Sequence, residues 1–356
     1  MWFLKINLIW IYLLIIFSAR STSFFNYWQN YSKHMVNLEK VIFGNLPLLG
    51  ISYQGKDKDR EYKEKFSEKD EIKKIMKIAL KNGIRYFACS SQDFNELSPI
   101  HLQSLKELED EQDIKIPLIA CAGIPMTLSG ERITDYRRWA THLTCELKYF
   151  EKTIRASYYE DPILNCRDDW RENLSTAKPY DLKELDRGLK INWSKWEDEM
   201  IRFSTHKIAW IEPGSESDFL ALCRMDLLEE LLDRTHEFGY RVLLGSHHLG
   251  ITFQLLNEER VKKHDGYVAP VNKFGIMMFP TKNEVEKCIK NARKEEKIIV
   301  SVKPFAGGRI QPKEALEYVY NEIGVDMCMI GAGSIEELEE DLEVASTILR
   351  DSQVTK

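Results

Sequence analysis

The feature that most constrains this chain is a repeated alternation of two kinds of segment. Beyond Met35, short apolar runs bounded by glycine or polar residues alternate with longer segments of helical periodicity. This alternation is typical of βα units that build a parallel sheet. We count eight units and predict strands at residues 46–53, 84–90, 117–122, 207–212, 241–245, 266–271, 298–303 and 325–330.

The segments between these strands carry helical periodicity and end signals. Ser67 is expected to cap the first helix, Gly83 and Gly239 fall just past the ends of theirs, and Pro312 lies in the first turn of another. Eight units with short loops close more naturally into a barrel than into an open sheet. The sequence therefore predicts an α/β fold, a (β/α)8 TIM barrel, with helices at residues 68–81, 218–238, 282–295, 312–321 and 335–349.

One stretch departs from the ideal barrel. Residues 127–205 follow the third strand, are far longer than one crossover needs, and read as mostly helical and rich in tryptophan and tyrosine. Because the insertion leaves a strand at its C-terminal end, it emerges on the face where such barrels hold their sites. It is either a lid over the site, or else a packed helical addition or an oligomer contact. The oligomeric state is not set by the sequence.

The barrel is assigned to residues 35–356, which leaves residues 1–34 as a hydrophobic N-terminal extension. Residues 2–19 approach the length of a membrane span, and Arg20, Lys33 and Lys40 would keep the barrel in the cytoplasm. A cleaved signal peptide is a weaker interpretation, because Phe17-Ser18-Ala19 lacks the usual small-x-small pattern. We favour a third interpretation, in which translation starts at Met35 and the protein is cytoplasmic.

Charge and cysteine content exclude some classes of protein. The net charge is −6 and basic residues are scattered, so nucleic acid is not an expected partner. The seven cysteines are odd in number and contain no C-x-x-C pair, which indicates a reducing compartment.

Candidate catalytic residues are the polar side chains at the C-terminal ends of the predicted strands. Glu212 ends the fourth, His247 and His248 follow the fifth, and Lys303 ends the seventh. Glu212, His247 and Lys303 are the predicted acid/base groups. Lys303 could equally be a Schiff-base amine or an ion-pair partner of Glu212. Adjacent histidines on a strand point to opposite faces, so no metal site is assigned.

Two glycine-containing loops follow the seventh and eighth strands, at the usual phosphate site of such barrels. Backbone N–H groups and a helix N-terminus converge there, and an arginine could add a bidentate contact. The alternative is that the glycines make tight turns and a serine caps its helix. The predicted anion-binding residues are Gly307, Gly308, Arg309, Gly331, Gly333 and Ser334.

The last quarter of the chain resembles the aldo/keto reductase superfamily, in the segments SVKPFAGGRI (residues 301–310) and IGAGSIEE (residues 330–337), with a weaker echo in ALKNGIRYF (residues 79–87). The resemblance implies a TIM barrel and NADP bound by the six residues of the two late loops. The family's catalytic residues do not transfer: Ala88 follows Tyr86-Phe87 where the family has Asp, and the third strand has no lysine. Glu212 stands at the family's fourth-strand histidine.

Three functions follow as hypotheses. The first is an enzyme that acts on a small anionic metabolite or uses a nucleotide, through Glu212, His247 and Lys303. The second is an aldolase or lyase in which Lys303 forms a Schiff base. The third is a non-enzymatic ligand-binding or membrane-tethered interaction protein, which requires that residues 1–34 be retained.

Overall fold

The computed structural model describes residues 38–151 and 153–354, and in this part of the chain eight parallel strands form one sheet. The strands are β1 (Val41–Phe43), β2 (Tyr86–Ser90), β3 (Leu118–Cys121), β7 (Ile208–Glu212), β8 (Leu243–Gly245), β9 (Gly266–Pro270), β10 (Ile298–Val302) and β11 (Met327–Ile330). Their spatial order is β7-β3-β2-β1-β11-β10-β9-β8. A parallel bridge from Ile211 to Val242 joins β7 to β8, so the sheet closes into the predicted (β/α)8 barrel.

Apolar side chains from all eight strands fill the barrel interior. They come from alternate strand positions, as the two-residue period of a strand requires, and Ile42, Ala88, Ile119, Trp210 and Val300 are five of them. The same period carries Cys121 and Glu212 to the next inward position, above Ile119 and Trp210. The polar layer of the barrel therefore lies at the C-terminal ends of the strands.

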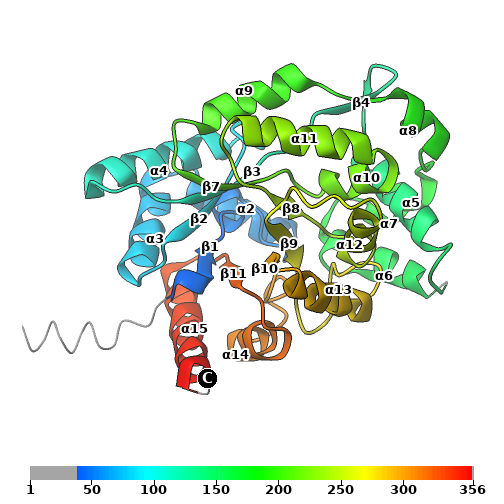
Figure 1. Ribbon diagram of the computed structural model, residues 1–356. Helices are drawn as coiled ribbons and strands as arrows, with labels where there is room; N and C mark the ends of the chain where they lie inside the picture. The colour runs from blue at the N-terminus through cyan, green and yellow to red at the C-terminus, as the bar shows by residue number, and fades with distance from the viewer. Residues whose placement is uncertain (1–37, 152, 355–356) are drawn as a thin grey trace, which may run out of the picture. The chain divides into compact units, whose positions relative to one another are not determined.

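Helices surround the strands, as Figure 1 shows. Each buries an apolar face: in α3, for example, Ile72, Ile75, Met76 and Ala79 face inward at helical spacing. The outer helices are α2 (Lys56–Phe66), α3 (Lys69–Lys81), α4 (Ser98–Gln112), α9 (Trp193–Phe203), α10 (Glu216–Cys223), α11 (Met225–Glu237), α12 (Leu249–Glu258), α13 (Lys282–Lys294), α14 (Pro312–Glu317) and α15 (Ile335–Val354).

The long insertion after β3 is helical with a small sheet. It contains β4 (Met126–Leu128), β5 (Glu131–Arg132), α5 (Asp135–Glu146), α6 (Ile154–Glu160), α7 (Trp170–Thr176), α8 (Leu182–Gly188) and β6 (Leu189–Ile191). Its own core, around Trp139, Tyr158 and Trp170, continues into Phe279 and Ala306 of the loops that follow β9 and β10. The insertion is thus packed onto the C-terminal face of the barrel.

The predicted position of the first strand was wrong. Residues 46–53 form a short 3-10 turn, Pro47–Leu49, and a loop, whereas the strand is β1 at Val41–Phe43. Pro47 lacks the N–H that a central strand needs, and Gly50 adopts a left-handed conformation with φ of 74°. The run Val41–Phe43 is fully buried but only three residues long, so its sequence signal is weaker than that of the longer apolar segment that follows.

Two helix expectations are also wrong in detail. The segment 218–238 is two helices, because Arg224 leaves the helical conformation at φ −150°. Ser67 does not cap α3; its hydroxyl donates to the Glu64 carbonyl at the end of α2. Gly83 and Gly239 end their helices at positive φ, and Pro312 occupies a first turn, as predicted.

Two expectations concern the N-terminus: a membrane anchor in residues 2–19 and a start at Met35. Both fall on residues outside the described part of the chain. Within residues 38–151 and 153–354, no helix has both the length and the apolar character needed to span a membrane. All seven cysteines lie in this part and are free thiols.

Candidate functional site

Lys303 lies just past the end of β10 and turns into the barrel mouth. Its backbone adopts φ of 55°, so the side chain does not continue the alternation of the strand. The Nζ atom is 3.3 Å from Nε2 of His247 and 5.2 Å from the centre of the Tyr53 ring. No carboxylate of the described residues forms an ion pair with Nζ within 4.0 Å, and the charge of Lys303 acts on the Glu212 and Asp161 carboxyls without such a pair. The lysine and histidine predicted from separate strand ends are therefore neighbours.

Glu212 faces the same space from β7. Burial raises the pKa of its carboxyl to about 7, while a hydrogen bond from the Cys121 thiol and the positive charge of Lys303 oppose that rise. Its Oε1 lies over Gly245, where a Cβ would be only 2.1 Å away. The glycine that ends β8 thus makes room for the carboxylate. A buried carboxyl that titrates near neutrality suits proton transfer.

His247 is the third predicted residue, and it is enclosed. Burial lowers the pKa of its imidazole well below the ordinary value, and the charge of Lys303 lowers it further, so the ring is neutral. The ring stacks on Trp139 of the insertion at 5.9 Å, and its Nδ1 is buried without a hydrogen-bond partner. A neutral imidazole can accept a hydrogen bond from the Lys303 ammonium.

Asp218, at the start of α10, fixes the loop that carries the two histidines. Its carboxylate accepts from the backbone N–H groups of His247 and His248 at 2.7 and 3.0 Å, and from the hydroxyls of Ser246 and Thr252 at 2.6 and 2.7 Å. Four donors to one buried carboxylate satisfy it fully. Sequence reasoning placed Asp218 at a helix start but did not assign it this role.

The insertion supplies further groups that sequence reasoning missed. Asp161 is buried, which raises the pKa of its carboxyl, and the charge of Lys303 together with N–H donors from Ile163, Leu164 and Met277 opposes the rise. The position of the insertion after β3 was the only sequence signal for these contacts. That position predicts that some side chains of the insertion reach the barrel mouth, but it does not identify them.

Several residues around the mouth have strained backbones. Tyr53, Met277, Lys303 and Ala306 all have φ between 51° and 62°, a region that side chains other than glycine rarely adopt. They belong to the loops that follow β1, β9 and β10. Each costs on the order of 1–3 kcal/mol, and such residues cluster at functional sites.

The predicted anion loop after β10 is engaged by the protein itself. Nη1 of Arg309 donates to the carbonyls of Tyr53, Ala306 and Gly307 at 3.0, 2.9 and 3.3 Å. A Cβ on Gly307 would lie 2.8 Å from the Tyr53 carbonyl, whereas one on Gly308 would meet only the side chain of Gln54. A phosphate at Arg309 would therefore compete with these carbonyls for the guanidinium.

The loop after β11 is engaged in a similar way. Ser334 Oγ accepts from the N–H of Glu337, and the Glu337 carboxylate accepts from the N–H of Gly333, so the two side chains cap the start of α15. Gly331 and Gly333 approach Pro47 and Tyr62 so closely that a Cβ would lie within 2.9 and 2.1 Å of them. The expectation that these glycines and Ser334 bind an anion stays a prediction.

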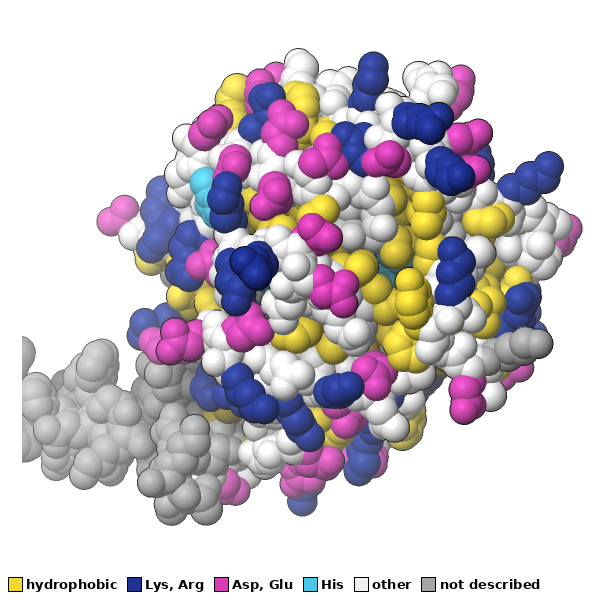
Figure 2. Space-filling model, turned by 45° about the vertical axis from the view of Figure 1, so that its right-hand side comes forward, with side chains coloured by type: hydrophobic (Ala, Val, Ile, Leu, Met, Phe, Trp, Pro, Cys, Tyr) yellow, Lys and Arg dark blue, Asp and Glu magenta, His cyan; other side chains and the backbone are white. Residues whose placement is uncertain are grey.

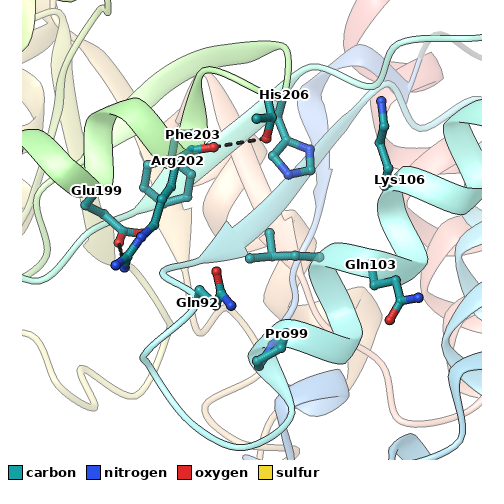
Figure 3. Close-up of a pocket in the computed structure, with 10 residues that line it drawn as sticks. Gln92, Pro99, Gln103, Lys106, Glu199, Arg202, Phe203 and His206 are labelled. Carbon is teal, nitrogen blue, oxygen red and sulfur yellow. Dashed lines mark hydrogen bonds and ion pairs between the residues drawn. The ribbon is translucent and has the colours of Figure 1, made fainter.

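Part of the molecular surface on the side of the insertion is apolar. Figure 2, in which the right-hand side of Figure 1 comes forward, shows hydrophobic side chains gathered around a hollow on the side where the insertion lies. A pocket of about 280 Å³ lies elsewhere, between α4 and α9 on the outside of the barrel (Figure 3). It contains none of the predicted site residues, and Arg202 on its rim is paired with Asp93 and Glu199. We do not assign it a function.

Comparison with known proteins gives distant structural similarity only. No family model and no curated protein matches the chain. Two structures titled as a "putative aldo-keto reductase" from Pseudomona aeruginosa match 87% of this chain and 90% of theirs, with 14% identity and a TM-score of 0.47. An amidohydrolase from Burkhoderia ambifaria with bound Zn matches 88% and 78%, at 7% identity and a TM-score of 0.39. Similarity this distant carries no inference about ligand or reaction.

Proposed function

We propose that this barrel is an enzyme that transfers a proton at the carbon next to the carbonyl group of a small anionic metabolite. One observation carries the proposal: Lys303, His247 and Glu212 come from three strand ends and meet at the barrel mouth. Active sites of TIM-barrel enzymes occupy this face. The strained backbone of Tyr53, Met277 and Lys303 around the same space supports the assignment.

Each group has a role that follows from its surroundings. The Lys303 ammonium is placed to hold the carbonyl oxygen and to stabilise the negative charge that develops there when the neighbouring carbon loses a proton. The Glu212 carboxylate takes that proton, and its pKa of about 7 makes it an effective base near neutral pH. His247 accepts a hydrogen bond from Lys303 and so orients the ammonium.

The charge at the mouth favours an anionic substrate. Lys303 makes no ion pair with a described carboxylate, so an acidic group of the substrate can balance its charge. Arg309 is a weaker candidate, because its guanidinium already donates to three carbonyls. We therefore place the acidic group of the substrate close to its carbonyl, within reach of Lys303.

Proton exchange in heavy water tests this directly. Pyruvate and dihydroxyacetone phosphate are incubated with the protein in D₂O, and NMR follows the loss of the hydrogens next to the carbonyl. We expect exchange in the wild type, and a loss of at least about 100-fold in E212Q and K303M. K313M, which changes an exposed lysine, should exchange like the wild type. Equal exchange in all four proteins would refute the proposal.

A second candidate reaction is a Schiff base on Lys303. The absence of an ion pair within 4.0 Å among the described carboxylates suits a nucleophilic amine, and the neutral imidazole 3.3 Å away orients it. Cyanoborohydride added with pyruvate would then reduce the imine and leave a mass increase on the Lys303 peptide. Exchange without labelling of Lys303 excludes this route and leaves the acid/base route.

The nucleotide expectation is tested separately. NADP at the two late loops would have to displace the acceptors to which Arg309 and the Gly333 N–H already donate, the Tyr53 carbonyl and the Glu337 carboxylate. Titration with NADPH and with FMN, followed by thermal unfolding, measures whether it does so. A rise in melting temperature that is lost in R309M would support binding there.

A further inference from the structure

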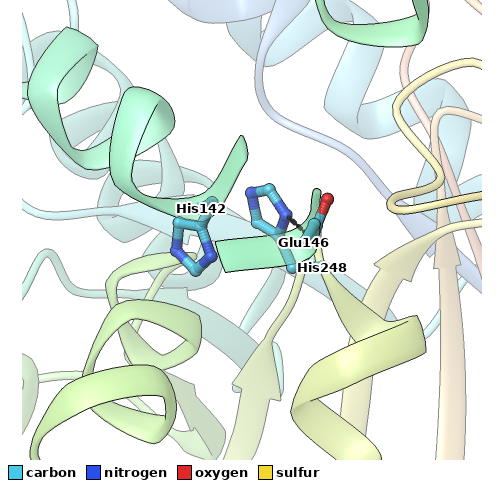
Figure 4. Close-up of side chains that lie close together, drawn as sticks. All are labelled: His142, Glu146 and His248. Carbon is cyan, nitrogen blue, oxygen red and sulfur yellow. Dashed lines mark hydrogen bonds and ion pairs between the residues drawn. The ribbon is translucent and has the colours of Figure 1, made fainter. Parts of the chain in front are cut away.

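Three buried side chains outside the proton-transfer site lie close enough to hold one metal ion. His142 and Glu146 come from α5 of the insertion, and His248 comes from the loop after β8 (Figure 4). One ligand atom from each lies within 4.8 Å of the other two. Their exposed fractions are 4%, 1% and 3%, so the cluster is closed to solvent.

The local structure presents these donors together. His142 and Glu146 are four residues apart on a helix and so project from one face. The His248 backbone is anchored by the Asp218 carboxylate, and its ring lies parallel to that of His142 with centroids 3.8 Å apart. Two elements separated by about a hundred residues in sequence thus bring two imidazoles and a carboxylate to one point.

The carboxylate of Glu146 is oriented by a neighbouring hydroxyl. Tyr158 of α6 donates to Oε2 at 2.5 Å, while Oε1 lies 2.8 Å from Nδ1 of His248. The Tyr158 hydroxyl is also 3.2 Å from that Nδ1, so it is a fourth potential ligand beside the two imidazoles and the carboxylate. A carboxylate ligand held by an outer hydrogen bond is typical of protein metal sites.

We infer that His142, Glu146 and His248 form a zinc site that joins the insertion to the barrel. Two imidazoles and a single carboxylate suit Zn²⁺, whereas Ca²⁺ and Mg²⁺ prefer sets of oxygen donors. All three side chains are buried, so the ion is closed to substrate, and the Tyr158 hydroxyl lies close enough to supply the fourth ligand that a structural zinc site needs. The zinc ion replaces the hydrogen bond between Glu146 and His248 and links α5 to the start of α12.

Metal analysis and thermal unfolding test the inference. Protein purified without chelator is analysed for zinc; chelated protein is then titrated with ZnCl₂. We expect one zinc ion per chain and a melting temperature that rises by about 5 °C or more on titration. Both effects should be absent in H142Q and E146Q. H101Q is the matched control, because His101 is equally buried and both its ring nitrogens lack a partner.

The outcomes separate this site from others in the chain. Wild-type protein that binds no zinc and shows no rise overturns the inference, and so does zinc retained by H142Q and E146Q. If those variants do not fold, the visible spectrum of the Co²⁺-loaded wild type decides. A spectrum typical of nitrogen and oxygen ligands supports the site. A thiolate band shows that cysteine binds the metal and refutes the inference. K303M should bind zinc like the wild type, so failure of the proposed reaction leaves this result unaffected.

Discussion

At the scale of single residues, Glu212 shows how the barrel produces a base that works near neutral pH. Its carboxyl is removed from water at the top of the barrel interior, which disfavours the charged form and raises the pKa to about 7. Lys303 opposes the rise without forming an ion pair within 4.0 Å. The buried acid therefore makes the stability of the folded state depend on pH.

The first prediction concerns this pH dependence of stability. The folded-state pKa of about 7 lies above the ordinary value of 4.5, so the native state binds the proton more tightly than the unfolded state. The contribution of Glu212 to the free energy of unfolding is fully present below pH 4.5 and is lost as pH rises through 7. E212Q should therefore gain stability relative to the wild type across that window, with a slope that approaches about 1.4 kcal/mol per pH unit.

Urea unfolding of both proteins at pH 5, 6, 7 and 8 measures the difference. Asp341, whose pKa burial raises to about 8, titrates in both proteins and cancels. E339Q, at an exposed position of α15, should show a constant difference from the wild type. Parallel stability profiles for E212Q and the wild type would show that Glu212 is not a buried acid.

At the scale of elements, the ends of β7 and β8 fit together only because β8 ends in glycine. A Cβ on Gly245 would lie 2.1 Å from Oε1 of Glu212 and 2.7 Å from the backbone carbon of Gly214. The carboxylate could rotate away, but the Gly214 backbone could not move without shifting the loop after β7.

The second prediction follows from this contact. G245A should destabilise the fold by about 1–3 kcal/mol and reduce proton exchange, because the added methyl group displaces the Glu212 carboxylate. G123A is the matched control, since Gly123 follows β3 at the same face and a Cβ there would meet nothing within 4 Å. Urea unfolding and the D₂O assay measure both effects; equal values for the two variants would contradict the prediction.

The elements were largely predictable from sequence because the signal is local. Alternation of apolar runs with helical periodicity predicted eight βα units, and the closed eight-stranded sheet confirms the barrel. The first strand was misplaced because Val41–Phe43 is short and an apolar loop follows it. The break at Arg224 depends on its side chain reaching Asp226 and the distant Leu189 carbonyl, which no local pattern reveals.

The sequence predicted only those site residues that lie at the C-terminal ends of strands. Glu212, His247 and Lys303 follow from the rule that chemistry lies at the C-terminal ends of barrel strands, and the structure brings them to one place. Glu146 meets His248 across 102 residues, a contact that no local pattern of one sequence encodes. The anion-binding role of Arg309 stays a prediction, and the sequence did not reveal the carbonyls to which its guanidinium donates.

At the scale of the whole described barrel, two apolar cores meet at the mouth. One fills the barrel interior around Trp210 and Val300, and the other joins the insertion to the loops after β9 and β10. Trp139 is central to the second core: its ring lies 5.3 to 5.8 Å from those of Tyr158, Trp170 and Phe279. It also contacts His247 and His248, so the same residue packs the insertion and encloses the site.

The third prediction separates these two cores. W139A removes a buried ring and should cost about 3–5 kcal/mol, because the surrounding aromatic side chains cannot fill the space. Hydrogen exchange should quicken in α5 to α7 and in residues 276–279, while the strands of the barrel keep their protection, since the interior core does not include Trp139. W193A, at a half-buried position of α9, should leave both regions protected. Uniform loss of protection in W139A would mean that the insertion and barrel unfold as one unit, and the closing of the site would then be inseparable from the stability of the fold.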